Sequence, residues 1–220
     1  LCLVMALVPM TAFAAGTTDS WDGTADTSWY DENETEFHLQ TAEQLAGMAK
    51  LINDDTAYFK DKTVYLDNHL DLGGHEWISI GDGANTDVGS FQGVFDGQSH
   101  VVYNLYSHEG LKSENKDNNN NLYRNGLFGS IYNATVKNLG IENADIVIPM
   151  KDGSTYGKGI LVDWMTHSTI NNCYTTGSIT GGSYVEKYIG GIAGFLNGNN
   201  SISQCYSTAA ITGNYDGEYY

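Results

Sequence analysis

Four tetrapeptides decide the fold of this chain: Val102-Tyr103-Asn104-Leu105, Val136-Lys137-Asn138-Leu139, Ile170-Asn171-Asn172-Cys173 and Ile202-Ser203-Gln204-Cys205. Each combines a β-branched residue, any residue, an amide and an apolar residue. Successive tetrapeptides begin 34, 34 and 32 residues apart. Because a fixed period of about 20 to 50 residues is typical of solenoids and repeat arrays, this spacing predicts stacked structural repeats.

A second block of residues recurs with a similar period. It reads Gly126-Leu127-Phe128-Gly129, then Gly159-Ile160-Leu161-Val162, then Gly191-Ile192-Ala193-Gly194. These blocks begin 33 and 32 residues apart. Two separate blocks that share one period rarely arise by chance, so the second block strengthens the prediction of a repeat protein.

The composition of the repeats favours strands over helices. They are rich in Gly, Asn, Thr, Ile and Tyr, which form helices poorly and in part form strands well. Short strands separated by Gly and Asn turns stack as a parallel β-helix, with rungs about 4.8 Å apart. We therefore predict an all-β fold in which residues 36–220 form one parallel β-helix. The predicted inward columns are Val102, Val136, Ile170 and Ile202, and Leu105, Leu139, Cys173 and Cys205.

An amide is expected at one corner of every rung. The four positions are Asn104, Asn138, Asn172 and Gln204. A buried amide without a partner costs about 1–3 kcal/mol, whereas stacked amides can hydrogen-bond to one another, as they do in cross-β ladders. We interpret this column as a structural ladder and not as a ligand site.

Residues 41–53 are the one convincing helix in the sequence. Thr41 is followed three residues later by Gln44, which fits a capping box. Leu45, Met48 and Ile52 then fall on one face at helical spacing. Because the open end of a β-helix exposes unpaired strand edge, we expect this helix to cap the N-terminal end.

Three further segments complete the predicted organisation. Residues 1–14 are apolar and end in Ala12-Phe13-Ala14, the small-x-small pattern that signal peptidase cuts, so they predict a signal peptide and secretion. Their apolar run is shorter than the ~20 residues of a membrane span. Residues 15–35 are expected to be an exposed lead-in, and the Asn-rich residues 112–123 an exposed inserted loop. Both ends of the chain are expected to be truncated.

The charge balance limits the classes of partner. The chain has 10 basic and 27 acidic residues and a formal net charge of -17. Nucleic-acid binding requires clustered Lys and Arg, so we predict no nucleic-acid partner. The acidity is typical of a solvated extracellular protein and leaves neutral or cationic partners open.

The two blocks resemble the GLUG-motif repeats of bacterial surface and secreted proteins. Gly126-Leu127-Phe128-Gly129 matches the Gly-Leu-x-Gly motif, and Gly191-Ile192-Ala193-Gly194 matches it more loosely. The resemblance implies a right-handed parallel β-helix in adhesin-like proteins, or in front of some IgA-specific metalloproteases. The family supplies no catalytic residues, so a function transferred from it is an analogy.

The sequence predicts no catalytic, metal or cofactor site. His75-Glu76-Trp77-Ile78-Ser79 begins like the zinc-protease motif His-Glu-x-x-His but has Ser where the second ligand belongs. Polysaccharide lyases and hydrolases with this fold need clustered acids on one outward face. Asp163, with His167 nearby, is the one outward candidate, and its equivalents Ser130 and Phe195 carry no charge.

Three tyrosines are the candidate ligand face. Tyr106, Tyr174 and Tyr206 each follow the inward column by one residue, so strand alternation turns them outward. Exposed aromatic rings along a rigid face can bind sugar rings or a protein partner. The same residues also serve as strand formers that pack on each other.

We draw three functional hypotheses from these patterns. The first is a non-enzymatic secreted or cell-surface repeat module, an adhesin-like stalk or binding platform for a host or microbial glycan or protein. The second is the N-terminal region of a larger secreted protease or other enzyme. The third is a β-helical polysaccharide lyase or hydrolase in its own right.

Overall fold

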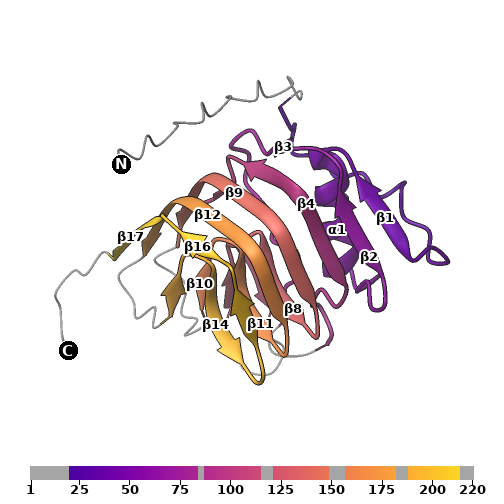
Figure 1. Ribbon diagram of the computed structural model, residues 1–220. Helices are drawn as coiled ribbons and strands as arrows, with labels where there is room; N and C mark the ends of the chain where they lie inside the picture. The colour runs from indigo at the N-terminus through magenta and orange to yellow at the C-terminus, as the bar shows by residue number, and fades with distance from the viewer. Residues whose placement is uncertain (1–19, 84–86, 115–120, 149–156, 182–187, 214–220) are drawn as a thin grey trace, which may run out of the picture.

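The chain folds as a parallel β-solenoid of about four turns. A computed structural model describes residues 20–83, 87–114, 121–148, 157–181 and 188–213. The described part is mostly strand and contains one helix, α1 (Ala42–Asn53). The predicted parallel β-helix with an N-terminal capping helix is therefore confirmed (Figure 1). The expected signal peptide, residues 1–14, lies outside the described residues.

One large parallel sheet forms most of the solenoid wall. Its strand order is β1 (Glu36–Leu39), β2 (Thr63–Leu66), β4 (Val94–Tyr103), β9 (Thr135–Val147), β12 (Thr169–Gly181) and β15 (Ser201–Ser203). Four short strands extend it: β3 (Leu70–Asp71) on β4, β5 (Tyr106–Ser107) on β9, and β16 (Tyr206–Ser207) and β17 (Ala210–Gly213) on β12. The strands of successive turns lie side by side in Figure 1.

Two smaller parallel sheets and a hairpin complete the turns. The first sheet contains β8 (Phe128–Tyr132), β11 (Val162–Thr166) and β14 (Ala193–Asn197), and the second pairs β10 (Lys158–Gly159) with β13 (Ile189–Gly190). Where an exposed inserted loop was expected at residues 112–123, β6 (Leu111–Glu114) and β7 (Asn121–Arg124) pair as an antiparallel hairpin. Residues 115–120 between them lie outside the described part.

The amides stand at corners because their backbone is left-handed. Asn138, Asn172 and Gln204 have φ angles of 54°, 52° and 54°. This region costs most L-residues about 1–2 kcal/mol, and Asn is among the few that visit it routinely. Asn172 Nδ2 donates to Asn138 Oδ1 (2.9 Å), and Asn138 Nδ2 donates to Asp96 Oδ1 (2.9 Å). The corner amides are half-buried or exposed, so the backbone requirement matters more than the expected burial.

The first tetrapeptide is out of register with the other three. Ile170 pairs with Val136 and Ile202, as the period predicts. Val102, however, pairs with Ile141, while Phe95 takes the place beside Val136. The spacing of 34 residues between Val102 and Val136 therefore does not correspond to one turn, and the inward column expected there is wrong at its first member.

Asn104 consequently lies at a second corner of the solenoid. Its backbone N–H donates to the carbonyl oxygen of Glu142 (2.9 Å), which places it level with Asn143. Both residues are left-handed, with φ angles of 56° and 58°. Asn104 Nδ2 donates to Asp71 Oδ1 (2.7 Å) and not to another ladder amide. The expected ladder must therefore be corrected to exclude Asn104.

The second sequence block is shifted by one residue. Val162 pairs with Phe128 and Ala193, and Gly159 pairs with Gly190. The glycines that open the three blocks are therefore not level with one another, although the blocks do lie on one face. The shift arises because the distance along the chain between paired residues differs by one residue from the distance between the glycines that open the blocks.

Helix α1 packs on the core in the first turn, between β1 and β2. Thr41 caps it, because the Thr41 hydroxyl accepts the backbone N–H of Gln44 (3.3 Å). The Gln44 side chain in turn accepts the backbone N–H of Gln40 (2.7 Å), a variant of the predicted capping box. Leu45, Met48 and Ile52 are fully buried and belong to the same apolar cluster as the strands.

The inward columns form a continuous core along the axis. Val136, Ile170 and Cys173 are buried, whereas Ile202 in the last described turn is 40% exposed. A fully buried aliphatic side chain contributes about 1.5–3 kcal/mol, so most of the stability comes from the middle turns. Cys173 and Cys205 are free thiols, and burial raises the pKa of Cys173 to about 12.

The lead-in segment is attached to the solenoid by its aromatic side chains. Most of residues 20–35 are exposed, but Trp21 is buried against Trp77, with ring centroids 5.6 Å apart. Trp29 stacks on Phe59 at 6.0 Å. These contacts fix the segment beside α1.

Candidate functional site

The rings of Tyr174 and Tyr206 form an offset parallel stack on the outer face of the large sheet. Their centroids are 5.3 Å apart and their planes differ by 6°. Tyr174 on β12 pairs in register with Tyr206 on β16, so the backbone of adjacent turns fixes the stack. Tyr206, in the last described turn, is 57% exposed.

Gly140 and Glu142 hold Tyr174 in place from the previous turn. Gly140 pairs with Tyr174, and a Cβ at Gly140 would lie only 2.6–2.7 Å from the end of the Tyr174 ring. The Tyr174 hydroxyl donates to a carboxylate oxygen of Glu142 (2.7 Å). Burial raises the pKa of Tyr174, and the hydrogen bond and negative charge of Glu142 raise it further. The phenol is therefore a neutral donor at physiological pH.

Tyr103 continues the aromatic surface on β4. It pairs in register with Glu142, which also accepts the bond from Tyr174. The His69 ring lies 6.0 Å from the Tyr103 ring and 5.0 Å from the His100 ring. We call Tyr103, Glu142, Tyr174 and Tyr206 the tyrosine strip. It crosses β4, β9, β12 and β16.

Tyr106 does not belong to this strip. It pairs with Asp145 on β9, beyond the second corner, and its ring stacks on His108 with centroids 4.0 Å apart. The three expected tyrosines are therefore not one face: Tyr174 and Tyr206 lie together, and Tyr106 lies elsewhere. The register error at Asn104 displaced Tyr106 as well, because both belong to the same stretch.

Tyr106 instead lines a polar hollow of about 450 Å³. Its other polar side chains include Asp71, Asn104 and Asp145. Asp71 accepts the side-chain N–H of Asn104 (2.7 Å), and Asp145 lies 3.1 Å from Nε2 of His108. These acids are engaged with the protein itself, so we assign the hollow a structural role.

Asp163, the expected outward acid, is fully buried. Its carboxylate accepts backbone N–H groups from Asn125 (2.7 Å), Gly126 (3.2 Å) and Gly159 (2.9 Å). His167 is exposed at a corner, where its Nδ1 accepts the N–H of Asn199 (3.2 Å). The prediction that Asp163 faces outward is therefore wrong, because the segments preceding β8 and β11 cover it.

Two cations accompany the buried carboxylate of Asp163. Burial raises the pKa of Asp163, and the charges of Lys158 and Arg124, with the backbone N–H donors, oppose that rise. Lys158 is fully buried and its ammonium donates to the carbonyl oxygen of Tyr123. Arg124 lies over the ring of Trp164 at 5.6 Å. The cluster joins the hairpin base to β11 and is a structural feature of the fold.

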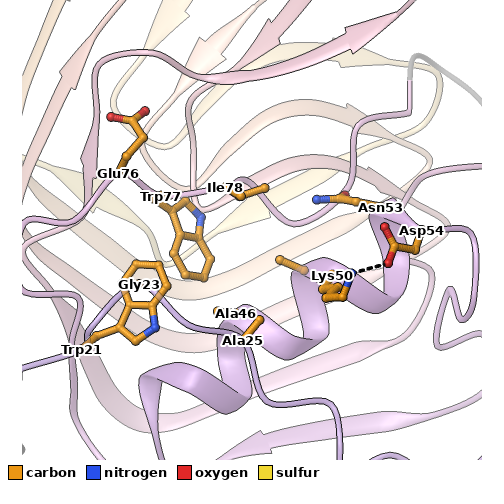
Figure 2. Close-up of a pocket in the computed structure, with 11 residues that line it drawn as sticks. Trp21, Gly23, Ala25, Ala46, Lys50, Asn53, Asp54, Glu76, Trp77 and Ile78 are labelled. Atoms are coloured by element: carbon orange, nitrogen blue, oxygen red, sulfur yellow. Dashed lines mark hydrogen bonds and ion pairs between the residues drawn. The ribbon is translucent and has the colours of Figure 1, made fainter.

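A second cavity, of about 290 Å³, lies between α1 and the segment around Trp77 (Figure 2). Its walls are mainly apolar and include Trp21, Ala46, Trp77 and Ile78. Both indole N–H groups are engaged: Trp21 donates to the carbonyl of Thr24 and Trp77 to that of Leu127. The indoles therefore offer a ligand apolar contact only.

The polar side chains around this cavity are also engaged with the protein. Lys50 and Asp54 form an ion pair at 2.6 Å near the end of α1 (Figure 2). Asn53 donates to the carbonyl of Ser79 (3.0 Å). Glu76 points away from the cavity and accepts backbone N–H groups of residues 108–110. We interpret the cavity as a packing gap between the capping helix α1 and the solenoid, and not as a ligand site.

Sequence reasoning missed Tyr103 and Glu142. Both occupy the second position of a corner tetrapeptide, since Ile141-Glu142-Asn143-Ala144 repeats the pattern of Val102-Tyr103-Asn104-Leu105. Aligning Val102-Tyr103-Asn104-Leu105 with Ile141-Glu142-Asn143-Ala144, and not with Val136-Lys137-Asn138-Leu139, would have given the correct register of β4 on β9. The same pattern therefore occurs at two different corners of one turn, at Asn138 and at Asn143.

The described part of the chain shows neither a metal site nor a membrane-spanning helix. Within it, no three His, Cys, Asp or Glu side chains come together as a metal site would require. No helix in the same residues is long and apolar enough to cross a bilayer.

Comparison with known proteins finds one distant similarity of interest. No protein-family model matches the chain, and no solved structure matches it significantly. The chain is similar to Halomucin of Haloquadratum walsbyi, with 29% identity over 178 residues. The matched region is 77% of this chain and 2% of Halomucin, so the chain spans a small fraction of that relative.

Proposed function

We propose that the chain is a secreted or cell-surface, non-enzymatic repeat module that binds a glycan on the tyrosine strip. The observation that carries the proposal is the parallel stack of Tyr174 and Tyr206, held in register on adjacent turns of a rigid sheet. Stacked aromatic rings on a surface bind ligands that present a flat apolar face. The C–H face of a pyranose ring is such a surface.

The polar groups of the strip complement the hydroxyl groups of a sugar. Glu142 accepts the Tyr174 hydroxyl through one oxygen, and its carboxylate has further acceptor capacity. The hydroxyls of Tyr103 and Tyr206 are donors and acceptors on either side of it. A site built on strands is also more rigid than a loop, which reduces the ordering cost of binding.

The proposal includes secretion through residues 1–14 and membership of the GLUG-type repeats. What supports the second point is the local packing of Gly126-Leu127-Phe128-Gly129. Leu127 and Phe128 are fully buried, and a Cβ at Gly126 or Gly129 would lie 2.5 or 2.1 Å from a carbonyl oxygen of a neighbouring turn. The similarity to Halomucin supports a repeat module without defining its ligand.

The test is binding of the folded chain to an array of neutral, cationic and anionic glycans together with extracellular-matrix proteins. We expect a selective glycan signal. Tyr206→Ala should weaken it about two- to tenfold, because an aromatic stacking contact contributes about 0.5–1.5 kcal/mol and 1.4 kcal/mol is a factor of ten. Tyr106→Ala is the matched control, since Tyr106 lies off the strip.

Two results would contradict the proposal. One is the absence of binding to every glycan by a chain whose circular dichroism shows the folded β structure. The other is glycan binding that Tyr206→Ala leaves unchanged or that Tyr106→Ala weakens equally. A signal confined to matrix proteins would point to a protein-binding module instead.

A further inference from the structure

The strands of the large sheet contain many more acidic than basic residues. The described strands of this sheet contain five acidic residues, Glu36, Asp71, Asp96, Glu142 and Asp145. Lys137 is the one basic residue in the same strands, and its ammonium lies 3.1 Å from Asp96. That pairing offsets the positive charge, so the strands of this sheet carry an excess of carboxylates.

Two of these carboxylates are placed at the tyrosine strip. Glu142 is a member of the strip and lies between Tyr103 and Tyr174 through its pairing and its hydrogen bond. Asp71 pairs in register with Tyr103 from the opposite side. A ligand lying on the strip therefore meets the carboxylate of Glu142 at the centre and, at one end, that of Asp71, one oxygen of which accepts the side-chain N–H of Asn104.

This charge pattern selects among glycans. Anionic sugars are repelled by the strip and by the net charge of -17. A protonated amine is attracted by the carboxylates, and also by the negative faces of the tyrosine rings. Neutral sugars gain the stacking contact and the hydrogen bonds of their hydroxyl groups, but no attraction between opposite charges. We therefore expect affinity for the strip to be highest for amine-bearing sugars, lower for neutral sugars and lowest for anionic sugars.

On the basis of the glycan-binding function proposed above, we infer that the strip selects glycans that carry protonated amino groups, such as N-deacetylated glucosamine polymers. The aromatic rings of the strip contact the sugar rings, and Glu142 accepts hydrogen bonds from an ammonium group. A glycan suits this surface better than a basic peptide because Tyr174 and Tyr206 place parallel rings 5.3 Å apart on adjacent turns, and successive sugar rings of a polymer also follow one another in a row.

The experiment compares two soluble ligands that differ in charge and share one backbone. The folded full chain is titrated calorimetrically at pH 6 with a glucosamine hexamer and with an N-acetylglucosamine hexamer. We expect the glucosamine hexamer to bind at least tenfold more tightly, and its affinity to fall as NaCl rises from 0.05 to 0.5 M. A lysine hexamer, which has charge without sugar rings, should bind at least tenfold more weakly.

Matched variants separate a site from general attraction of an acidic protein to a polycation. Glu142→Gln and Glu36→Gln each remove one negative charge from the same sheet, but Glu36 lies on the edge strand β1, outside the strip. We expect Glu142→Gln to weaken glucosamine-hexamer binding about tenfold and Glu36→Gln to change it less than twofold. Because the N-acetylated hexamer carries no ammonium group, Glu142→Gln should weaken its binding less than that of the glucosamine hexamer.

Each outcome bears on a different proposal. Equal binding of the two sugar hexamers overturns the selection for amino groups and leaves glycan binding intact. Equal effects of Glu142→Gln and Glu36→Gln, or equal binding of the lysine hexamer, also overturn it, because they show charge attraction without a site. Failure of both sugar hexamers and of every glycan on the array overturns glycan binding itself.

Discussion

The ring of Tyr174 lies over the backbone of Gly140, and no side chain larger than hydrogen fits between them. An ideal Cβ at Gly140 would lie 2.6 Å from Cζ and 2.7 Å from the hydroxyl oxygen of Tyr174. The same ring is parallel to Tyr206 and bonded to Glu142. One glycine therefore determines where the aromatic stack lies relative to the sheet.

Gly140→Ala is expected to move the Tyr174 ring without unfolding the chain, because the contacts are with the far end of a mobile side chain. The displaced hydroxyl loses Glu142, at a cost of about 1 kcal/mol for a typical hydrogen bond. The pKa of Tyr174 should then fall toward its ordinary value, and glycan binding should weaken. Urea unfolding and difference titration of tyrosine absorbance measure both effects. Gly213→Ala, where a Cβ meets nothing within 4 Å, is the control.

The second prediction concerns His100 and acid stability. Burial lowers the pKa of His100, and the charge of His69 lowers it further. Below the ordinary value of 6.5, the unfolded chain therefore binds more protons at this residue than the folded chain, and stability falls as pH falls through that window. His100→Gln should reduce this loss between pH 7.5 and 5.5, as measured by urea unfolding at both values. A difference between variant and parent that does not change with pH would contradict the assignment.

The sequence predicted the fold class but not the complete register. Period and composition were sufficient for a parallel β-helix, because each turn repeats the same buried and corner positions. Val102-Tyr103-Asn104-Leu105 was placed at the wrong corner because two corners of one turn demand the same residue types. Only the pairing of Val102 with Ile141, a contact between distant strands, distinguishes them.

The candidate site was predicted in part for the same reason. Tyr174 and Tyr206 were found because their repeats are in register. Tyr103 and Glu142 were missed, and Tyr106 was included, because the register of β4 on β9 was unknown. Strand alternation does not report burial by other segments, so it could not show that Asp163 is covered.

The corner residue Asn172 allows a direct test of the backbone requirement. Its φ of 52° favours Asn or Gly over other residues. Asn172→Ala should destabilise the fold by about 1–2 kcal/mol. Asn172→Gly should cost only a few tenths of a kcal/mol, because glycine adopts positive φ without steric strain. The urea midpoints of the two variants, compared with that of the parent chain, measure these losses. Equal losses would indicate that the side-chain bond to Asn138, and not the backbone, is what the corner needs.

Asp163 provides the strongest stability prediction. Its carboxylate accepts three backbone N–H groups and faces the charges of Lys158 and Arg124 in a fully buried setting. Asp163→Asn replaces one acceptor oxygen with a donor and removes the buried negative charge that Lys158 and Arg124 face. Removing one partner of a buried ion pair costs about 3–5 kcal/mol, so we expect a loss of that size in the free energy of unfolding.

Asp145→Asn is the matched control for that variant. Asp145 is also an ion-pair partner, of His108 at 3.1 Å, but its side chain is 52% exposed. Exposed pairs contribute about 0–1 kcal/mol because water and salt screen them. Urea unfolding of the two variants should therefore differ by at least about 2 kcal/mol, the gap between these ranges. Similar small losses would mean that the buried cluster near the hairpin base does not need its charge, and that apolar packing around Trp164 alone holds the hairpin to β11.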